Sequence, residues 1–228
     1  ESVKTCKKRI KVIAGTGANS TREAVALTRF AADIGADGTL QVAPYYNKPN
    51  QEGLTRHFSK VADIGLPVVL YNIPGRTGVE IAVDTVARLA KHPKITTIKE
   101  AGGSVTRVSQ ILEVCDIGVL CGDDPLTIPM MSVGAKGVIS VAANIAPGVV
   151  SEMVHSALAG NWTRAMSLHR RYFRLFSDVF LDTNPIPVKA ALAMLGLIEE
   201  EYRLPLCPMS KALRNRLAEG LRELKLIK

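Results

Sequence analysis

PVVLY (residues 67–71) and ITTIK (residues 95–99) are short runs of apolar and β-branched residues, each followed by glycine, proline or polar residues. Runs of this length and composition predict buried β-strands. The same pattern predicts four more strands, at Ile10–Ala14, Gly38–Ala43, Ile117–Cys121 and Gly137–Ala142. Consecutive strands begin 20 to 29 residues apart, which leaves room for one helix between each pair.

Amphipathic helices are predicted between these strands. Apolar residues recur at helical spacing in three connecting segments: Ala24, Leu27, Ala31 and Ile34; Leu54, Phe58 and Val61; and Val108, Ile111, Leu112 and Cys115. Ser20 followed by Glu23 predicts a capping box, Ser104 an N-cap, and Asp124 an N-cap ahead of Pro125. Strict alternation of strands and helices implies a parallel sheet, and alone it fits both an open doubly wound sheet and a closed barrel.

The strands end at about Asn144, and the rest of the chain is predicted to be helical. Helices are expected at Pro147–Ala159, Thr163–Phe180, Pro187–Leu197 and Ser210–Leu224. We interpret residues 1–160 as a barrel and residues 161–228 as a C-terminal helical domain. A closed barrel needs eight strand–helix units and roughly 250 residues. We therefore expect an α/β fold, a TIM (β/α)8 barrel of which strands 3–8 are present and the first two βα units are absent from this sequence. A true six-stranded α/β protein is the alternative.

Composition disfavours several classes of function. The net charge of +8 is spread over many segments without a nucleic-acid motif, so no nucleic-acid partner is expected. The longest apolar run, near Val188–Ile198, is too short to span a bilayer, and no secretory signal is visible. The four cysteines lack metal-site spacing, which indicates free thiols in a reducing compartment. No GxGxxG follows a strand, which disfavours a dinucleotide site.

Lys99 and Tyr71 end two of the predicted strands, and function collects at the carboxyl ends of barrel strands. A strand-end lysine either reaches solvent or is desolvated, in which case burial favours a neutral amine that can attack a carbonyl and form a Schiff base. A tyrosine there either packs its ring or passes protons to such intermediates. Arg76, in the turn-rich loop after Tyr71, is either solvated or grips a carboxylate.

Seven strings along the chain resemble the dihydrodipicolinate synthase family, whose members are also called 4-hydroxy-tetrahydrodipicolinate synthases. They are GTGANS (15–20), APYYNKP (43–49), LYNIPGRTG (70–78), TIKEAGG (97–103), CGDD (121–124), GVISVAAN (137–144) and NPIPVK (184–189). Their order and spacing follow the family over essentially the whole chain, which makes the resemblance highly specific. It implies a TIM barrel with a C-terminal helical domain, assembled as a homotetramer of two tight dimers.

The resemblance also assigns roles to individual residues. Lys99 matches the lysine that captures pyruvate as a Schiff base, and Tyr71 matches the proton donor over the bound keto acid. Tyr46 matches the relay tyrosine that crosses the tight-dimer interface into the neighbouring site. Arg76 matches the arginine that holds the carboxylate of the aldehyde substrate, and Ile139 matches a position whose backbone lines the pyruvate pocket.

Two further features follow from the family. Asn19, Glu23 and Tyr45 match positions of an allosteric site for L-lysine, a feedback inhibitor, although Glu23 is also the predicted capping partner of Ser20. The family's GTTGE-type segment, which supplies the relay threonine, is not in this sequence. Either the sequence is part of a longer enzyme or the polypeptide lacks part of its relay, and the first reading is preferred because a barrel without a quarter of its wall exposes strand edges.

The implied function is a lyase of lysine (diaminopimelate) biosynthesis that condenses pyruvate with L-aspartate 4-semialdehyde to 4-hydroxy-tetrahydrodipicolinate. Such a reaction needs no metal and no organic cofactor, because the lysine imine is itself the electron sink. The alternatives are a sibling pyruvate aldolase such as N-acetylneuraminate lyase, or a catalytically silent paralogue that lacks the relay threonine. The expected compartment is the cytoplasm, or a plastid if the protein is of plant origin.

Overall fold

The computed structural model describes all 228 residues, Glu1–Lys228. The chain divides into two compact units, Glu1–Gly122 with Ser132–Gly137, and Asp123–Met131 with Val138–Lys228. No helix has the length and apolar character that a membrane span requires.

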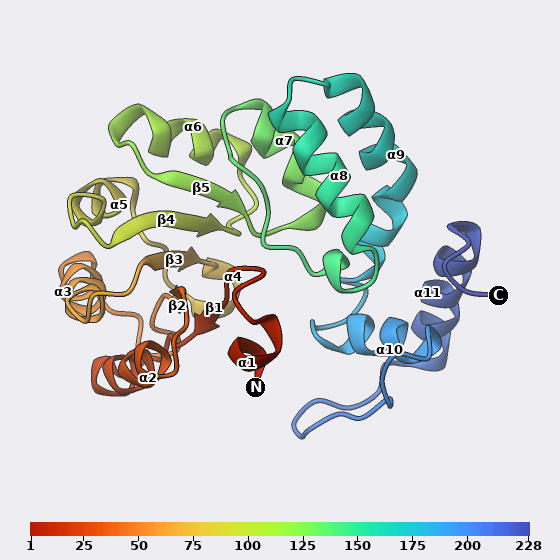
Figure 1. Ribbon diagram of the computed structural model, residues 1–228, viewed down its shortest axis with the longest axis horizontal. Helices are drawn as coiled ribbons and strands as arrows, with labels where there is room; N and C mark the ends of the chain where they lie inside the picture. Colours follow the sequence, from red (N-terminus) through yellow and green to blue (C-terminus); the bar gives the residue numbers. More distant parts are fainter. The chain divides into compact units, whose positions relative to one another are not determined.

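The first unit is built on a five-stranded parallel sheet (Figure 1). Its strands are β1 (Ile13–Gly15), β2 (Gly38–Val42), β3 (Val68–Asn72), β4 (Ile95–Glu100) and β5 (Gly118–Cys121), and they pair in chain order. A doubly wound sheet reverses its strand order at a switch point, whereas each strand of a barrel wall pairs with the strands before and after it. The observed order is therefore that of a barrel wall, which resolves the choice that alternation left open.

The helices of this unit follow the strands. Figure 1 shows α2 (Thr21–Asp33), α3 (Gln51–Ala62), α5 (Val83–Leu89) and α6 (Val105–Val114) in succession along the sheet, and consecutive helices pack on one another. Two short helices, α1 (Ser2–Cys6) and α4 (Pro74–Thr77), complete the unit. The predicted stripe of α3 is confirmed, because Leu54, Phe58 and Val61 are fully buried.

The predicted apolar stripe of α2 is only half right. Ala24 and Ala31 are buried, but Leu27 and Ile34 are exposed, and Thr28 takes the remaining place on the buried face. The hydroxyl of Thr28 lies 2.9 Å from that of Thr16 and accepts a hydrogen bond from Gln41 of β2 at 3.0 Å. A satisfied polar residue thus occupies a core position that the apolar pattern assigned to its neighbours.

The sixth predicted strand, Gly137–Ala142, is wrong as a strand. Only its first residues pair with β5: the Cys121 N–H donates to the Gly137 carbonyl, and residues 142–144 form a 3₁₀ helix, η2 (Ala142–Asn144). β5 itself ends at Cys121, and the Asp124 carboxylate accepts hydrogen bonds from the backbone N–H groups of Val141 at 2.9 Å and Ala142 at 3.3 Å. Those donors are therefore not available to a strand ladder.

The predicted helix starts are partly confirmed. The Ser104 hydroxyl accepts from the Arg107 N–H at 3.3 Å, as an N-cap does. Ser20 occupies the N-cap position of α2 but makes no side-chain cap hydrogen bond, so the predicted capping box is absent. The 3₁₀ helix η1 (Asp124–Leu126) has Asp123 as its N-cap, one residue before the predicted one, because Asp124 is engaged with residues 140–142.

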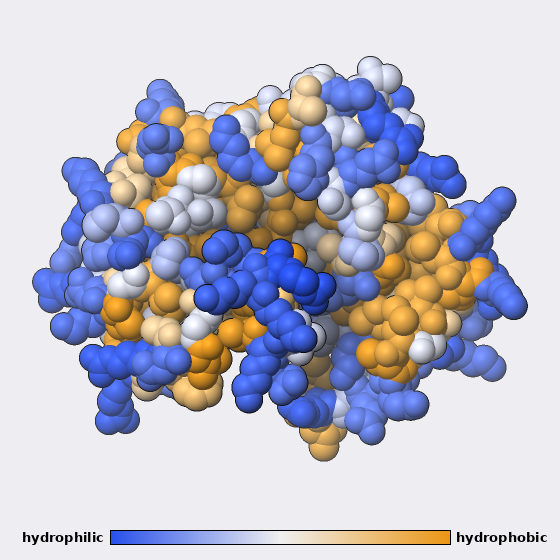
Figure 2. Space-filling view, in the orientation of Figure 1, coloured by the Kyte–Doolittle hydropathy of each residue, from blue (hydrophilic) through white to orange (hydrophobic).

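The second unit is helical. Its elements are η1, α7 (Thr127–Ser132, of which Thr127–Met131 belong to this unit), η2, α8 (Pro147–Leu158), α9 (Trp162–Asp178), α10 (Ile186–Met194) and α11 (Lys211–Glu223), and the four predicted helices are confirmed to within a few residues. The buried Asp178 joins α9 to α11, since Arg174 and Arg216 each donate to it at 3.3 Å. Figure 2 shows apolar residues at the surface where α10 and α11 lie, and Leu197 and Leu204 are among the exposed large apolar side chains of this unit.

Candidate active site

Lys99 and Tyr71 lie side by side at the carboxyl ends of β4 and β3. The strand register pairs the two residues directly, so their side chains leave the sheet on the same face. Lys99 is 8% exposed, and its Nζ lies 4.2 Å from the centre of the Tyr71 ring. The lysine is therefore a buried amine beside an aromatic hydroxyl-bearing side chain, and not a residue that reaches solvent.

The environment of Tyr71 keeps its phenol protonated. Burial raises the pKa of Tyr71, and the positive charge of Arg76 lowers it in part. Burial favours the neutral phenol because an ionised Tyr71 oxygen would lose its hydration inside the protein. The protonated phenol can donate a hydrogen bond to a group bound beside the amine.

Gly122, just after β5, gives Lys99 its room. A Cβ at this position would lie 2.8 Å from Lys99 Cε and 2.7 Å from Ala101 Cβ, closer than carbon atoms pack. The sequence places Gly122 at a predicted strand end, within the CGDD string, but indicates no role for it. Its position directly after the strand that neighbours β4 was the available signal, because a glycine at a strand end often marks a close approach.

Arg76 lies on α4, which starts at Pro74 and ends at Gly78 in the left-handed conformation, φ 73°. The guanidinium is on an exposed residue, and its charge acts on the Tyr71 phenol. A Cβ on Gly78 would come within 2.8 Å of Lys48 Cε, so the Lys48 side chain lies against this turn. The loop of Tyr46 and the loop of Arg76 are therefore in contact.

Tyr45 and Tyr46 follow β2 on an exposed loop. Tyr46 is 90% exposed and has φ 73°, a conformation that bulky residues rarely adopt outside functional or strained positions. The Asn47 side chain donates to the Asn19 carbonyl at 2.9 Å, which brings the loop of Asn19 next to the loop of Tyr45. Glu23, the third predicted lysine-site residue, is exposed on the first turn of α2.

Ile139 belongs to the second unit and is half-buried. It directly precedes Ser140, whose hydroxyl donates to the Asp124 carboxylate and accepts from the Ala143 N–H at 2.8 Å. The backbone around Ile139 is therefore shaped by Asp124, a residue that the sequence analysis treated only as a helix cap.

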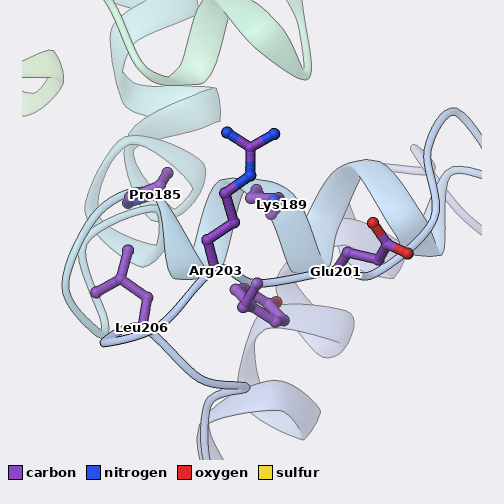
Figure 3. A pocket seen from close by; sticks show the side chains of 6 residues that line it. Pro185, Lys189, Glu201, Arg203 and Leu206 are labelled. Carbon is purple, nitrogen blue, oxygen red and sulfur yellow. The ribbon is translucent and has the colours of Figure 1, made fainter.

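The second unit also holds a cavity of about 550 Å³ between α10 and the segment after it. Figure 3 shows Pro185 and Leu206 on one side of it and Glu201 on the other, with Lys189 and Arg203 between them. The Lys189 ammonium lies 5.4 Å from the centre of the Tyr202 ring. None of the predicted site residues lines this cavity.

A barrel-type α/β sheet that buries a lysine against a tyrosine at the carboxyl ends of adjacent strands has the architecture of the class I, imine-forming lyases. The chain belongs to the dihydrodipicolinate synthetase family: the sequence model of the "Dihydrodipicolinate synthetase family" matches residues 1–224. The family resemblance found in the sequence is thereby confirmed.

Individual relatives agree with this membership. The chain is 52% identical over 223 residues to the 4-hydroxy-tetrahydrodipicolinate synthase of Geobacter metallireducens, covering 96% of this chain and 77% of that protein. It superposes on the crystal structure of dihydrodipicolinate synthase from Aquifex aeolicus with a TM-score of 0.97 and 50% identity, covering 99% of this chain and 78% of that one. The lysine-bound enzyme of Cyanidioschyzon merolae matches with a TM-score of 0.94 and 40% identity, over 99% of this chain and 78% of that one.

Proposed function

We propose that the protein is a lyase that condenses pyruvate with L-aspartate 4-semialdehyde to give 4-hydroxy-tetrahydrodipicolinate, a step of lysine biosynthesis. The relatives at about 50% identity carry the name of this activity. The observation that supports the chemistry in this chain is the buried Lys99 amine, 4.2 Å from the ring centre of Tyr71.

The chemistry starts with the neutral Lys99 amine, which adds to the ketone carbon of pyruvate. The carbinolamine loses water to give an imine, and Tyr71 donates the proton that the leaving oxygen needs. Loss of a proton from the pyruvate methyl group gives an enamine, because the imine accepts the electron pair. The enamine carbon then attacks the aldehyde carbon of the second substrate, forming the carbon–carbon bond. The amino group of that substrate finally attacks the imine carbon, closes the ring and releases Lys99.

Arg76 and Ile139 are assigned to substrate binding. The exposed Arg76 guanidinium, on the loop that follows Tyr71, is placed to pair with the carboxylate of the incoming aldehyde. The family resemblance assigns the Ile139 backbone to the pyruvate pocket. Truncation of Arg76 to alanine removes both the positive charge and the two donors that a guanidinium offers to a carboxylate. Arg76→Ala is therefore expected to raise the KM for the aldehyde more than that for pyruvate.

Tyr46 is assigned to proton relay in the site of a neighbouring subunit. The support is the match of Tyr46 to the family's relay tyrosine, together with its 90% exposure in the single chain and its left-handed backbone, which is a conformation that clusters at functional sites. The assignment requires at least a dimer, and the family resemblance implies a homotetramer built from two tight dimers. The assignment also implies that Tyr46→Phe lowers activity without lowering the stability of the isolated chain.

The remaining assignments concern regulation, compartment, the domain boundary, and the partners and cofactors of the reaction. The contact between the loops of Asn19 and Tyr45, and the lysine-bound relative, support an L-lysine site that also includes Glu23. We assign the protein to the cytoplasm, or to a plastid if the source is a plant. We place the end of the barrel near residue 160, with residues 161–228 as the C-terminal helical domain. Pyruvate and the aldehyde are the small-molecule partners, and the reaction uses no metal or organic cofactor.

Borohydride trapping tests the proposed function. The protein is incubated with pyruvate and borohydride, digested and mapped, and the expected product is a reduced pyruvate adduct on Lys99. Lys99→Ala abolishes the adduct, whereas Lys60→Ala, a change of an exposed lysine on α3, leaves it unchanged. An adduct that persists in Lys99→Ala contradicts the assignment, and turnover of sialic-acid precursors without turnover of the semialdehyde favours N-acetylneuraminate lyase instead.

A further inference from the structure

Three polar side chains are buried behind the Lys99–Tyr71 pair. Asn72 and Glu100 are the next residues along β3 and β4, and the strand register pairs them with each other. Because side chains alternate between the faces of a sheet, this second pair lies on the face opposite the reactive pair. Asn72 and Glu100 are fully buried, and Arg107 of α6 is 6% exposed.

The Glu100 carboxylate is held by donors from three directions. The Asn72 amide donates to its two oxygens at 3.0 and 3.1 Å, the Gly102 N–H donates at 2.7 Å, and Arg107 Nε donates at 2.9 Å. A charge-assisted hydrogen bond in a buried site is short and directional, so the carboxylate is fixed in position. Glu100 therefore ties the end of β3, the loop after β4 and the start of α6 to one point.

The network extends to the segment that precedes α5. The Asn72 side-chain oxygen, Oδ1, accepts from the Ile81 N–H at 3.0 Å, and the Arg107 guanidinium donates to the Ile81 backbone carbonyl. Arg107 also pairs with Glu80 at 3.3 Å. Both polar groups of the Ile81 backbone are thus engaged by side chains of the same network.

We infer that Asn72, Glu100 and Arg107 form a positioning network for the reaction, which fixes the ends of β3 and β4 so that the Tyr71 hydroxyl and the Lys99 amine meet the same keto acid. This inference rests on the proposed function. Peptide bonds link each network residue in the strands to a reactive residue, so a shift of the Asn72–Glu100 pair moves Tyr71 relative to Lys99. Misplacement by about 1 Å lowers the rate of such reactions by about a hundredfold.

A core ion pair with a purely structural role offers a matched control. Asp178 is 1% exposed and accepts from Arg174 and Arg216 at 3.3 Å, so Asp178→Asn and Glu100→Gln both remove one buried carboxylate charge with little change of shape. Both variants are expected to lose thermal stability. Glu100→Gln leaves the buried Arg107 guanidinium with only the exposed Glu80 as a charged partner, and Asp178→Asn removes the buried carboxylate that Arg174 and Arg216 share. Only Glu100→Gln is expected to slow imine formation in the folded protein.

The experiment measures the rate of borohydride-trapped adduct formation on Lys99 against pyruvate concentration, on folded protein. Glu100→Gln is expected to lower the maximal rate by about tenfold to a hundredfold with a smaller change in the pyruvate concentration at half-maximal rate. Arg107→Lys keeps the charge but not the guanidinium fork, so an intermediate loss is expected, and this variant carries the test if Glu100→Gln does not fold.

The outcomes separate the two claims. No adduct on Lys99 in the unmodified protein overturns the proposed function itself. If the unmodified protein forms the adduct and Glu100→Gln forms it at the same maximal rate, the positioning network alone is overturned. The same holds for Arg107→Lys if only that variant folds. A loss of maximal rate in Asp178→Asn equal to that in Glu100→Gln also overturns it, because the effect would then follow stability and not position.

Discussion

Gly122→Ala tests how closely the structure fits the reactive lysine. The new Cβ would lie 2.8 Å from Lys99 Cε and 2.7 Å from Ala101 Cβ. Carbon atoms in contact are about 3.5 Å or more apart, so each contact must open by at least about 0.7 Å. The end of the lysine chain moves more easily than Ala101, whose Cβ is fixed to the backbone. We therefore expect the Lys99 amine to be displaced from the Tyr71 ring.

The expected effects are large on the chemistry and moderate on stability. A displacement of this size lowers the rate of imine formation by about tenfold to a hundredfold. Overpacking of a tight site costs about 1–3 kcal/mol of the free energy of unfolding. The rate is measured by borohydride trapping with pyruvate on folded protein, and stability by thermal or denaturant unfolding.

Gly118→Ala is the matched control, at the other end of β5. Its nearest contacts would be 3.3 Å to the Thr96 carbonyl and 3.4 Å to the Thr97 hydroxyl, which need only small adjustments, and neither is Lys99. The control is expected to keep the rate of imine formation within about threefold of the unchanged protein, since less than 1 kcal/mol of barrier is at stake. If Gly122→Ala traps pyruvate as fast as the unchanged protein, the account of the space around Lys99 is wrong.

Three further predictions concern stability. His57 is 4% exposed, and burial lowers its pKa to about 4, whereas in the unfolded chain its pKa is near the ordinary 6.5. The stability that the neutral ring contributes is therefore complete above pH 6.5 and falls by up to about 3 kcal/mol towards pH 4. The free energy of unfolding in denaturant should accordingly differ less between pH 7 and pH 5 in His57→Gln than in the unchanged protein. Phe58→Ala removes a fully buried ring of α3 and is expected to cost about 3–5 kcal/mol in denaturant unfolding, and a cost under about 1 kcal/mol would contradict the packing. Gly220→Ala adds a Cβ 2.9 Å from Asp178 Oδ2 and 3.1 Å from Arg174 Nε. It should therefore lower the melting temperature, although alanine favours helix over glycine by about 1 kcal/mol. A rise in the melting temperature would show that the α9–α11 ion pair is dispensable.

Local pattern predicted most of the secondary structure because those elements are fixed by apolar burial. Strands β2–β5 and the helices α3, α6 and α8–α11 follow the apolar spacing closely. The first strand does not: β1 covers Ile13–Gly15 instead of the predicted Ile10–Ala14, and both Ile10 and Ile13 are exposed. The other predictions that failed did so where polar side chains form hydrogen bonds. Asp124 binds the backbone donors of residues 141 and 142, which are therefore not available to the end of the predicted sixth strand. A hydrogen-bonded Thr28 replaces an expected apolar residue on the buried face of α2. Neither partner is near in sequence, so the pattern could not reveal them.

In the candidate site, too, residues that end apolar strands could be predicted, whereas polar residues held by long-range contacts could not. Lys99 and Tyr71 could be chosen from the sequence because each ends an apolar strand, and the register places them directly together. The polar pair behind them was missed, since Asn72 and Glu100 read as the first residues of loops. Alternation along the strands was the available signal: a polar residue next to a buried strand-end residue lies on the other, helix-covered face. Arg107 could not be found in this way, because it reaches the site from α6.

Mass spectrometry of the borohydride-reduced pyruvate adduct is the most direct test of the central claim, that the buried Lys99 amine is the imine-forming group. The account predicts one adduct per chain, located on the peptide that contains Lys99 and absent from Lys99→Ala. An adduct on any other lysine, or none in the presence of pyruvate, would contradict it.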